Sequence, residues 1–326
     1  PSADTAVVVP GGDSFMTVDF GREVVGYPIL RIRDGGTGVI DIGYSESLDE
    51  SGDVDPARQG VLQADRLILH GGRQEWQTLG RRAFRYAQLT FRDHVAPLRV
   101  ESISVDSVGY PVEQVSTFDC SDDLLNRTWQ TGLHTLSLCM QDHYESSPLV
   151  GRSQKISDTR LQALINYYTF HDAKLVAKTL RRLAGRQDED GLLWVIALHD
   201  YHLHIGDRPL VERLYPEARL LMTGYDSEDG PPTVVALHYQ ALRDTAKLAS
   251  AVGEIEDTIL WHDRAEQVLR SFNDRFWSED HCAYEADLYT NGLAVLFGLA
   301  DSRRCGLISR LFESRADDLR SVKPAA

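Results

Sequence analysis

The first third of the chain consists of short apolar, β-branched or aromatic runs that are separated by Gly, Pro and Asp. Such runs are typical of strands joined by turns. The expected strands cover residues 15–20, 28–33, 38–44, 65–69, 76–78, 84–91 and 100–108. Gly71-Gly72, which lies between two of these runs, predicts a hairpin turn. Seven short strands in succession predict a β-sandwich.

After Pro111 the apolar residues follow the spacing of amphipathic helices. Ser121 is the expected N-cap of the first helix, whose apolar face begins at Leu125. Further helices are expected over residues 158–170, 173–183, 193–204, 209–221, 233–252, 256–277 and 288–300. The change of period predicts a β-sandwich domain over residues 1–115 and a helical domain over residues 116–326.

Composition and charge narrow the possible partners. The chain is 42% hydrophobic and 25% charged, which is ordinary for a folded, soluble protein. Its net charge of -15 repels phosphate backbones, and its Lys and Arg residues are scattered, so we expect no nucleic-acid partner. No apolar run approaches the roughly 20 residues of a membrane span, and no signal-peptide pattern is visible. Compartment and oligomeric state stay open.

The residues that most often bind metals do not form a metal-site pattern. Four cysteines lie far apart without CxxC spacing, so we expect free, mostly buried thiols rather than a zinc site or a disulfide scaffold. They are Cys120, Cys139, Cys282 and Cys305. His199 and His202 would share a helix face, but His204 would not, which makes a three-ligand site poor. No metal or other cofactor is expected.

The candidate functional site is the polar run of residues 139–162, between the first two expected helices. Loops held between packed helices carry chemistry more often than the helices, because their side chains are not committed to the core. The run is rich in carboxylates and in other groups that can bind or transfer a proton. They are Asp142, His143, Glu145, Arg152, Lys155 and Asp158.

Several short motifs, in the order in which they occur, give the chain a family resemblance. They are Phe-Gly-Arg-Glu-Val-Val-Gly-Tyr at residues 20–27, Gly-Arg-Arg-Ala-Phe-Arg-Tyr at 80–86, Cys-Ser-Asp-Asp-Leu-Leu-Asn at 120–126, Cys-Met-Gln-Asp at 139–142, Asp-Thr-Arg-Leu-Gln at 158–162, and the stretch 200–207. Together they resemble the bacterial α-L-rhamnosidases of glycoside hydrolase family 78. The resemblance implies a jelly-roll-like β-sandwich followed by an (α/α)6 toroid. It also implies an inverting hydrolase that releases terminal L-rhamnose from a carbohydrate substrate.

The resemblance breaks down in the catalytic loop. The loop of the family reads roughly Asp-x-Pro-x-Arg-Glu-Arg, an aromatic residue, and then Gly-Asp. When this pattern is aligned on Pro148, its first Asp falls on Ser146, its Arg on Val150 and its general-acid Glu on Gly151. Because a glycine cannot donate a proton, another carboxyl group would have to act as the acid. An inverting glycosidase needs two such groups, about 6.5 to 9.5 Å apart.

The remaining polar residues give the candidate site. The candidate catalytic residues are Asp158, Glu145 and Asp142, and the candidate substrate-binding residues are Arg152, Trp194, His143, Lys155 and Asp200. Arg152 and Asp158 match the family pattern, whereas Lys155 replaces its aromatic residue. For three of these residues a simpler, purely structural role is also possible. Asp158 can stabilise a helix N-terminus, Arg152 can pair with Glu145, and Trp194 can be a core residue.

Three functions follow from this pattern. The first is an α-L-rhamnosidase-like glycoside hydrolase, which the resemblance favours. The second is a catalytically impaired relative that binds carbohydrate, because the acid position is lost. The third is a lyase that acts on a rhamnosyl-uronate, since Lys155, His143 and Arg152 could serve such an elimination.

The helical region is too short for a complete toroid. A toroid needs twelve helices, and this region supports about seven to nine. At residues 191–194 and 221–232 the sequence is short, whereas the family has longer segments at the corresponding places. The chain is either a naturally shortened relative or a sequence from which internal segments are missing, and we favour the second explanation.

Overall fold

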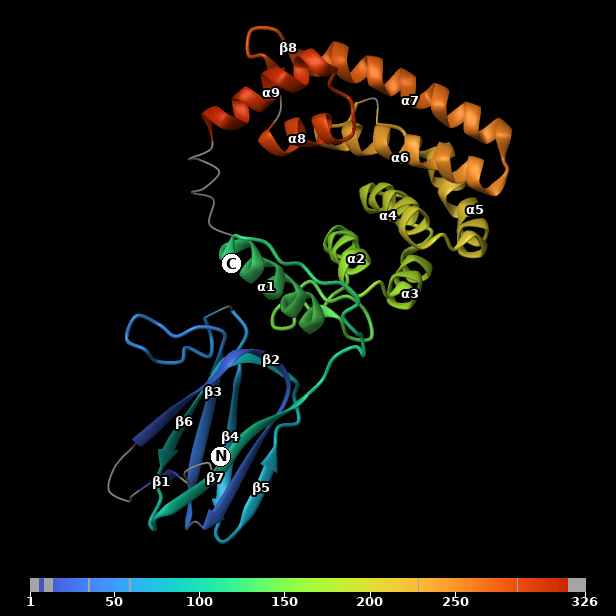
Figure 1. The fold of residues 1–326 in the computed structure, drawn as a ribbon. Helices are drawn as coiled ribbons and strands as arrows, with labels where there is room; N and C mark the ends of the chain where they lie inside the picture. The colour runs from blue at the N-terminus through green and yellow to red at the C-terminus, as the bar shows by residue number, and fades with distance from the viewer. Residues whose placement is uncertain are drawn as a thin grey trace. The chain divides into compact units, whose positions relative to one another are not determined.

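The computed structural model describes residues 6–8, 14–34, 36–58, 60–227, 229–285 and 287–315 (Figure 1). The chain divides into two compact units, Pro1–Lys155 and Ile156–Ala326. The last strand of the large sheet ends at Ser107, and the first helix, α1, covers Asp123–Cys139. The predicted domain boundary at residue 115 therefore lies where strands give way to helices. The first compact unit extends beyond it and includes α1 and the candidate loop.

The first unit contains one curled, antiparallel sheet. Its strands are β1 (Ala6–Val8), β2 (Ser14–Asp34), β3 (Thr37–Ser45), β4 (Ala64–His70), β5 (Gln74–Gln77), β6 (Arg82–Arg92) and β7 (Leu98–Ser107). They are ordered β1-β7-β2-β6-β3-β4, and β5 also pairs with β2. Strand β2 merges the two predicted strands at residues 15–20 and 28–33. The other predicted strands agree with β3 to β7 within a few residues.

The length of β2 explains how one sheet makes a sandwich-like fold. Its first part pairs with β6, whereas its part from Gly26 onward pairs with β7 on one edge and with β5 on the other. The pairing with β6 shifts register between Asp19 and Val24, and Gly21 in between has φ 78°, which a side chain would strain. The sheet curls here around a shared apolar core. This arrangement confirms the predicted sandwich-like domain.

The core of this unit follows the alternation of the strands. In β3, Ile40, Ile42 and Tyr44 are buried at 1% exposure or less, whereas Asp41 and Gly43 face the other side of the sheet. Inward-facing residues of β2, β4, β6 and β7 complete the same cluster. They include Leu30, Ile32, Leu67, Leu69, Phe84, Leu89, Phe91, Leu98 and Val100.

The predicted hairpin at Gly71-Gly72 is wrong in one respect. Both glycines have positive φ, 84° and 73°, so the chain turns there as expected. However, the strands on either side are not neighbours, because β4 pairs with β3 and β5 pairs with β2. The turn therefore carries the chain from one part of the curled sheet to another. Local turn residues indicate a reversal but do not determine the partner of each strand.

The second unit is helical. Its helices are α2 (Ile156–Thr169), α3 (Ala173–Leu183), α4 (Glu189–Ile205), α5 (Arg208–Gly224), α6 (Pro232–Val252), α7 (Ile255–Phe276), α8 (Leu288–Leu296) and α9 (Ser302–Ser314), and the short strands β8 (Trp277–Ser278) and β9 (Ala283–Tyr284) form a ribbon. Within this unit they follow one another along an arc (Figure 1). The even-numbered helices contact one another in series, and the odd-numbered helices pack against them. This is part of an (α/α) toroid, so the expected incomplete toroid is confirmed.

The predicted helices agree with α2 to α8 within a few residues, but α4 begins at Glu189, four residues before its predicted start. Asp122, rather than the predicted Ser121, caps α1, and its Oδ1 accepts from the backbone N–H of Leu124 at 2.7 Å. Gly206 and Gly253 end α4 and α6 in the left-handed conformation, as expected. Helix α9 was not predicted as a separate element.

The two places where the sequence is short, residues 191–194 and 221–232, lie beside each other within the second unit. Gly191 and Trp194 both lie inside the continuous helix α4. A Cβ atom on Gly191 would lie only 2.6 Å from the Arg186 carbonyl oxygen and 2.9 Å from Leu221 Cδ2. Residue 221 of the second place therefore packs directly on residue 191 of the first. The absence of internal segments stays a prediction.

Two further expectations concern cysteines and membrane spans. All four cysteines are free, as expected, but only Cys139 is buried, so the expectation of mostly buried thiols is wrong. The other three lie on partly exposed helix ends and turns. Among the described residues, no helix combines the length and apolar character that a membrane crossing requires.

Candidate functional site

The candidate loop of the first unit follows α1 and is closed by its own hydrogen bonds. The backbone N–H and the hydroxyl of Ser146 both donate to the Ser153 carbonyl oxygen, at 3.2 and 3.1 Å. The Ser147 N–H donates to the Gly151 carbonyl oxygen at 3.2 Å. A Cβ atom on Gly151 would lie 3.3 Å from the Cβ of Ser146. The two positions where the alignment loses an acid therefore lie side by side in the loop.

Glu145 is held in a buried ion pair. The Nη2 of Arg81 donates to Oε1 at 2.6 Å and to Oε2 at 2.7 Å, and the two side chains are 14% and 5% exposed. Arg81 precedes β6, so this contact ties the loop to the sheet. A glutamate in such a pair is a carboxylate, which has no proton to donate. The structure thus gives Glu145 an anchoring contact, and its role as an acid stays a prediction.

Arg152, the one Arg of the family loop that is retained, also joins the loop to the sheet. Its Nη2 donates to the Arg81 carbonyl oxygen at 2.7 Å, and its Nε donates to the Pro148 carbonyl oxygen at 3.0 Å. Burial lowers the pKa of Arg152, and the guanidinium of Arg81 lowers it further. Arg81 is therefore the shared partner of Glu145 and Arg152.

Asp142 and His143 form a second polar pair in the loop. The Nδ1 of His143 lies 2.5 Å from Oδ1 of Asp142, and its Nε2 lies 3.1 Å from the Arg152 carbonyl oxygen. Both neighbours are acceptors, so only a doubly protonated ring can donate to both. The Asp142 side chain is 76% exposed. Of the carboxyl groups in this loop, Asp142 is the one that solvent and a substrate can reach.

Glu23 is a partly buried carboxyl group that the sequence analysis missed. It lies in β2, and its Oε1 is buried without a hydrogen-bond partner in the described structure. Burial, and then the charge of Glu46, raise the pKa of Glu23 to about 7. The same two carboxyl groups and Glu145 lie near Cys139, where burial is the largest cause that raises the thiol pKa to about 11. No local signal in the sequence indicates this cluster, because Glu23, Glu46 and Glu145 lie far apart in the chain.

We expect Glu23→Gln to stabilise the sheet unit at pH 8 and to change little at pH 5. The pKa of Glu23 rises from 4.5 to about 7 on folding, so the folded state holds a proton that the unfolded chain has lost. The contribution of Glu23 to the free energy of unfolding is therefore most favourable below pH 4.5, and it is lost as the pH rises through 7. Because the group is partly exposed, we expect a gain of only about 1–3 kcal/mol at pH 8.

Thermal unfolding at the two pH values measures this effect, with the exposed Glu50→Gln as the matched control. Equal changes in Tm for Glu23→Gln and Glu50→Gln at pH 8 would show that burial of the Glu23 carboxyl group does not destabilise the folded state.

The remaining candidates belong to the second unit. Asp158 lies in the first turn of α2, as its structural alternative predicted. Trp194 is 2% exposed, and its Nε1 donates to the Leu180 carbonyl oxygen at 2.8 Å, so it occupies a core position. Asp200 pairs with Nε of Arg160 at 2.8 Å, and burial raises its pKa. The burial of Trp194 and its hydrogen bond to Leu180 therefore favour the alternative that Trp194 is a core residue.

A buried polar network connects α4 and α6 in this unit. Asp244 is 1% exposed and has three partners, His199 Nδ1 at 3.2 Å, Lys247 Nζ at 3.0 Å and Gln240 Nε2 at 2.8 Å.

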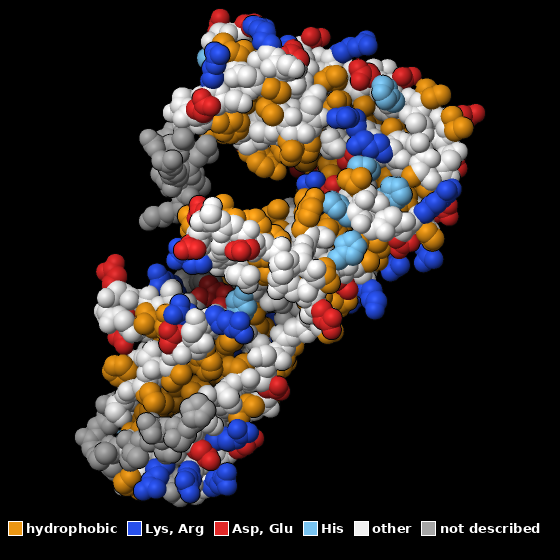
Figure 2. Space-filling view, in the orientation of Figure 1, with side chains coloured by type: hydrophobic (Ala, Val, Ile, Leu, Met, Phe, Trp, Pro, Cys, Tyr) orange, Lys and Arg blue, Asp and Glu red, His pale blue; other side chains and the backbone are white. Residues whose placement is uncertain are grey.

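The ring of His204 stacks on Tyr167 with centroids 4.6 Å apart. Histidine side chains also gather on the visible face of the helical unit (Figure 2). In the described part of the chain, no group of His, Cys, Asp and Glu could hold a metal ion.

The eight candidate residues are thus divided between the units. Asp142, His143, Glu145, Arg152 and Lys155 belong to the first unit, and Asp158, Trp194 and Asp200 belong to the second. Lys155 is exposed and is the last residue of the first unit. The structure brings His143 into contact with Asp142 and Arg152, and it places Arg81 between Glu145 and Arg152. Arg81 was not among the candidates.

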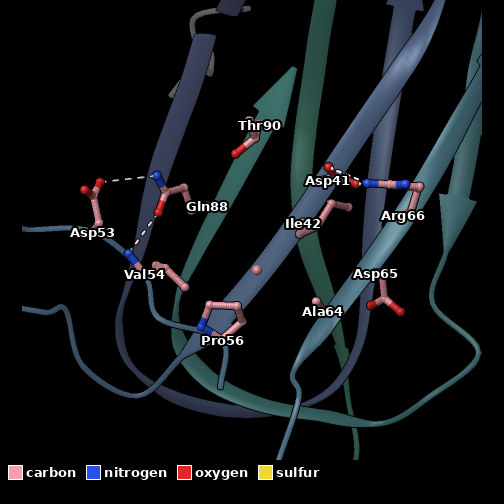
Figure 3. A pocket seen from close by; sticks show the side chains of 11 residues that line it. Asp41, Ile42, Asp53, Val54, Pro56, Ala64, Asp65, Arg66, Gln88 and Thr90 are labelled. Atoms are coloured by element: carbon pink, nitrogen blue, oxygen red, sulfur yellow. Dashed lines mark hydrogen bonds and ion pairs between the residues drawn. The ribbon is translucent and has the colours of Figure 1, made fainter. Parts of the chain in front are cut away.

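A cavity of about 620 Å³ lies on the outer face of β3, β4 and β6 (Figure 3). Its polar side chains largely bind one another. Gln88 accepts from the Val54 N–H at 2.8 Å and donates to Asp53 at 3.3 Å, and Asp41 pairs with Arg66 at 2.6 Å. No candidate residue lines this cavity. These contacts hold the loop after β3 against the sheet, so we do not place the chemistry there.

Comparisons with known proteins agree with the two-part architecture. Residues 11–106 match the family model of the bacterial alpha-L-rhamnosidase concanavalin-like domain. Residues 113–200 match the model of the bacterial alpha-L-rhamnosidase 6 hairpin glycosidase domain. An alpha-L-rhamnosidase of Formosa agariphila is 27% identical over 128 residues, which are 37% of this chain and 13% of that protein.

Two solved structures extend the likeness to nearly the whole chain. The GH78 family rhamnosidase of Bacillus sp. GL1 is 27% identical with a TM-score of 0.85, covering 100% of this chain and 39% of its own. The rhamnosidase of Klebsiella oxytoca with rhamnose bound is 19% identical with a TM-score of 0.74, covering 95% of this chain and 72% of its own. The chain thus spans 13% of the Formosa relative and 39% of the Bacillus relative, well under half of each. Because both domain models match in sequence order and together cover more than half of its residues, the chain belongs to the bacterial α-L-rhamnosidase family, glycoside hydrolase family 78.

Proposed function

We propose that this protein is a glycoside hydrolase that releases terminal α-linked L-rhamnose from glycans or glycosides with inversion at the anomeric carbon. The observation that carries the proposal is the likeness of the whole chain, through both units, to the Bacillus rhamnosidase. The rhamnose bound to the Klebsiella relative supports the choice of sugar. No cofactor is required for this chemistry, because two carboxyl groups suffice.

The proposed mechanism depends on Asp158 and on a second carboxyl group. Inversion needs one acid at the leaving oxygen and one base on a water at the opposite face of the ring. Asp158 is the acidic residue of the family loop that this chain retains. Of the loop carboxyl groups, Asp142 is exposed, whereas Glu145 is buried against Arg81. We therefore propose Asp158 as one of the two reacting groups. Within the loop, we propose that Glu145 has a holding role, and Asp142 stays the exposed carboxyl candidate.

The other candidates would bind the sugar. His143, Arg152 and Lys155 offer hydrogen-bond donors on the same loop as Asp142. Asp200 is 15% exposed and would present a carboxylate oxygen to a sugar hydroxyl, in addition to its contact with Arg160. Trp194 would support the site from the core, because its ring is almost fully buried.

A catalytically impaired, carbohydrate-binding relative is the second candidate function. The contact between Ser146 and Gly151 favours it, because both acid positions of the loop are lost at one place. The hydrogen bonds from Ser146 and Ser147 that close the loop show that the change is accommodated in the fold. A lyase that acts on a rhamnosyl-uronate remains the third reading, and the exposed Lys155 near the retained Arg152 is the feature in its favour.

Products formed in heavy-oxygen water separate these functions. The protein is incubated with an aryl α-L-rhamnoside and with a rhamnosyl-glucuronate, and the products are analysed by mass spectrometry and early-time NMR. Heavy oxygen at C1 of rhamnose, with the inverted anomer formed first, is the expected result. Incorporation with retention would contradict the inverting mechanism. An unsaturated uronate would instead support the lyase, and saccharide binding without any product would support the impaired relative.

A further inference from the structure

A second cavity, of about 260 Å³, lies in the helical unit between α6, α7 and the chain segment that precedes α6. The residues that the argument uses are Asp226, Ser227, His238, Arg264, Gln267 and Arg275. None of the candidate catalytic or substrate-binding residues lines it. The cavity therefore needs an explanation that is separate from the proposed hydrolase site.

His238 is the central group of this cavity. Its ring is 2% exposed, and its Nδ1 lies 2.8 Å from Oγ of Ser227, which is 5% exposed. Its Nε2 is buried without a hydrogen-bond partner in the described structure. Burial, and then the charge of Arg264, lower the pKa of His238 to about 4, so the ring is neutral at pH 7. When the Ser227 hydroxyl donates to Nδ1, the single ring proton is on Nε2 and lacks an acceptor.

Two guanidinium groups line the same cavity as this unused donor. Arg264 is held in place, because it donates to the Met222 and Tyr225 carbonyl oxygens at 2.5 and 3.2 Å and lies over the Trp261 ring. Arg275 also lines the cavity and lies further along the same helix, α7, near its C-terminal end. Among the described lining residues, Asp226 is the one carboxylate, so the arginines there exceed the acids by one positive charge. The Gln267 amide adds a further donor.

We propose that this cavity binds a small oxyanion, a carboxylate or a phosphate group, between His238 and the two arginines. Guanidinium groups bind planar and tetrahedral oxyanions through paired hydrogen bonds, and a neutral imidazole N–H supplies one more donor. The volume admits such a group together with a small sugar ring. The Ser227–His238 pair does not form a hydrolytic triad within the described residues, because none of their carboxylates binds the second ring nitrogen. The proposal does not depend on the rhamnosidase function.

Titrations of the whole chain with three probes test this proposal. The probes are inorganic phosphate, sodium glucuronate and the neutral methyl α-glucoside, and binding is followed by calorimetry and by the ring ¹⁵N shifts of His238. We expect phosphate, glucuronate or both to bind and to shift the Nε2 signal, whereas the neutral glucoside does not. Binding of phosphate alone or of glucuronate alone supports the site and identifies the source of the oxyanion.

Variants connect the binding to the cavity. Arg275→Gln should weaken the binding of the oxyanion by at least about 10-fold, because a charge-assisted hydrogen bond is lost. Arg270→Gln is the matched control, since Arg270 is exposed on the same helix and does not line the cavity. It should stay within about twofold of the unchanged protein. Equal effects of both variants, or equal binding of the neutral glucoside, would overturn the proposal, as would no binding by either oxyanion.

Discussion

Arg81→Met is expected to destabilise the sheet unit by about 3–5 kcal/mol, because it removes the guanidinium that donates to both oxygens of the buried Glu145 carboxylate. The Glu145 side chain is 5% exposed and accepts twice from Arg81. The same substitution should also release the candidate loop, since Arg152 donates to the backbone of residue 81. Urea unfolding at pH 7 measures the loss, and hydrogen exchange of the amides of residues 145–153 reports on the loop.

Arg31→Met is the matched control for this experiment. Arg31 also binds a glutamate, Glu75, at 2.7 Å, but their side chains are 42% and 61% exposed. An exposed pair contributes at most about 1 kcal/mol, so the control should lose far less stability. Arg81→Met combined with Glu145→Gln should recover part of the loss, because the buried charge that has lost the guanidinium of Arg81 is then removed as well. Similar losses for Arg81→Met and Arg31→Met would show that the pair does not anchor the loop.

Asp158→Asn is expected to lower kcat/KM for rhamnoside hydrolysis by roughly 10²–10⁴-fold, which is the usual contribution of a group that transfers a proton. Asparagine keeps the size of the side chain and a hydrogen-bonding oxygen but cannot exchange the proton. Its effect on stability should be small, because a first-turn carboxylate contributes about 0.3–1 kcal/mol. A progress curve with an aryl rhamnoside and a thermal melt of the same sample separate the two effects.

Asp123→Asn controls for the helix-terminus role of Asp158. Asp123 is the first-turn acid of α1 and has no predicted catalytic role. It should lose a similar amount of stability and none of the activity. If Asp158→Asn kept the activity of the unchanged protein, Asp158 would be excluded as a catalytic residue and the search would turn to Asp142.

The pattern of apolar residues predicted the elements well but not their partners. The period of two in residues 38–44 and the helical period after Leu125 are local, so each element could be placed from its own residues. Strand β2 was divided in two because Gly21 and its neighbours resemble a turn, although the strand only bends there. The Gly71-Gly72 turn is real, yet its two strands pair elsewhere. Strand pairing is decided by the core that the whole sheet encloses.

The sequence predicted the position of the candidate loop between the first two helices, where the structure has it, and the role of its residues stays a prediction. Residues 142–152 form one polar loop, as their composition predicted. That Glu145 is bound by Arg81, 64 residues away in the chain, could not be read from the sequence, because nothing local connects them. Glu23 was missed for the same reason. Its high pKa results from burial and from Glu46, both of which exist only in the folded unit.

The amino-acid order alone therefore determined the strand and helix content, the change from sheet to helices, and the loss of the acids at Ser146 and Gly151. These properties depend on short-range periodicity and on the identity of single residues. Only the tertiary structure decided which charges are paired, which carboxyl groups keep a proton, and that the two lost positions touch. Charge pairing and pKa depend on desolvation and on distances of a few ångströms, and only folding sets these for residues that are far apart in the chain.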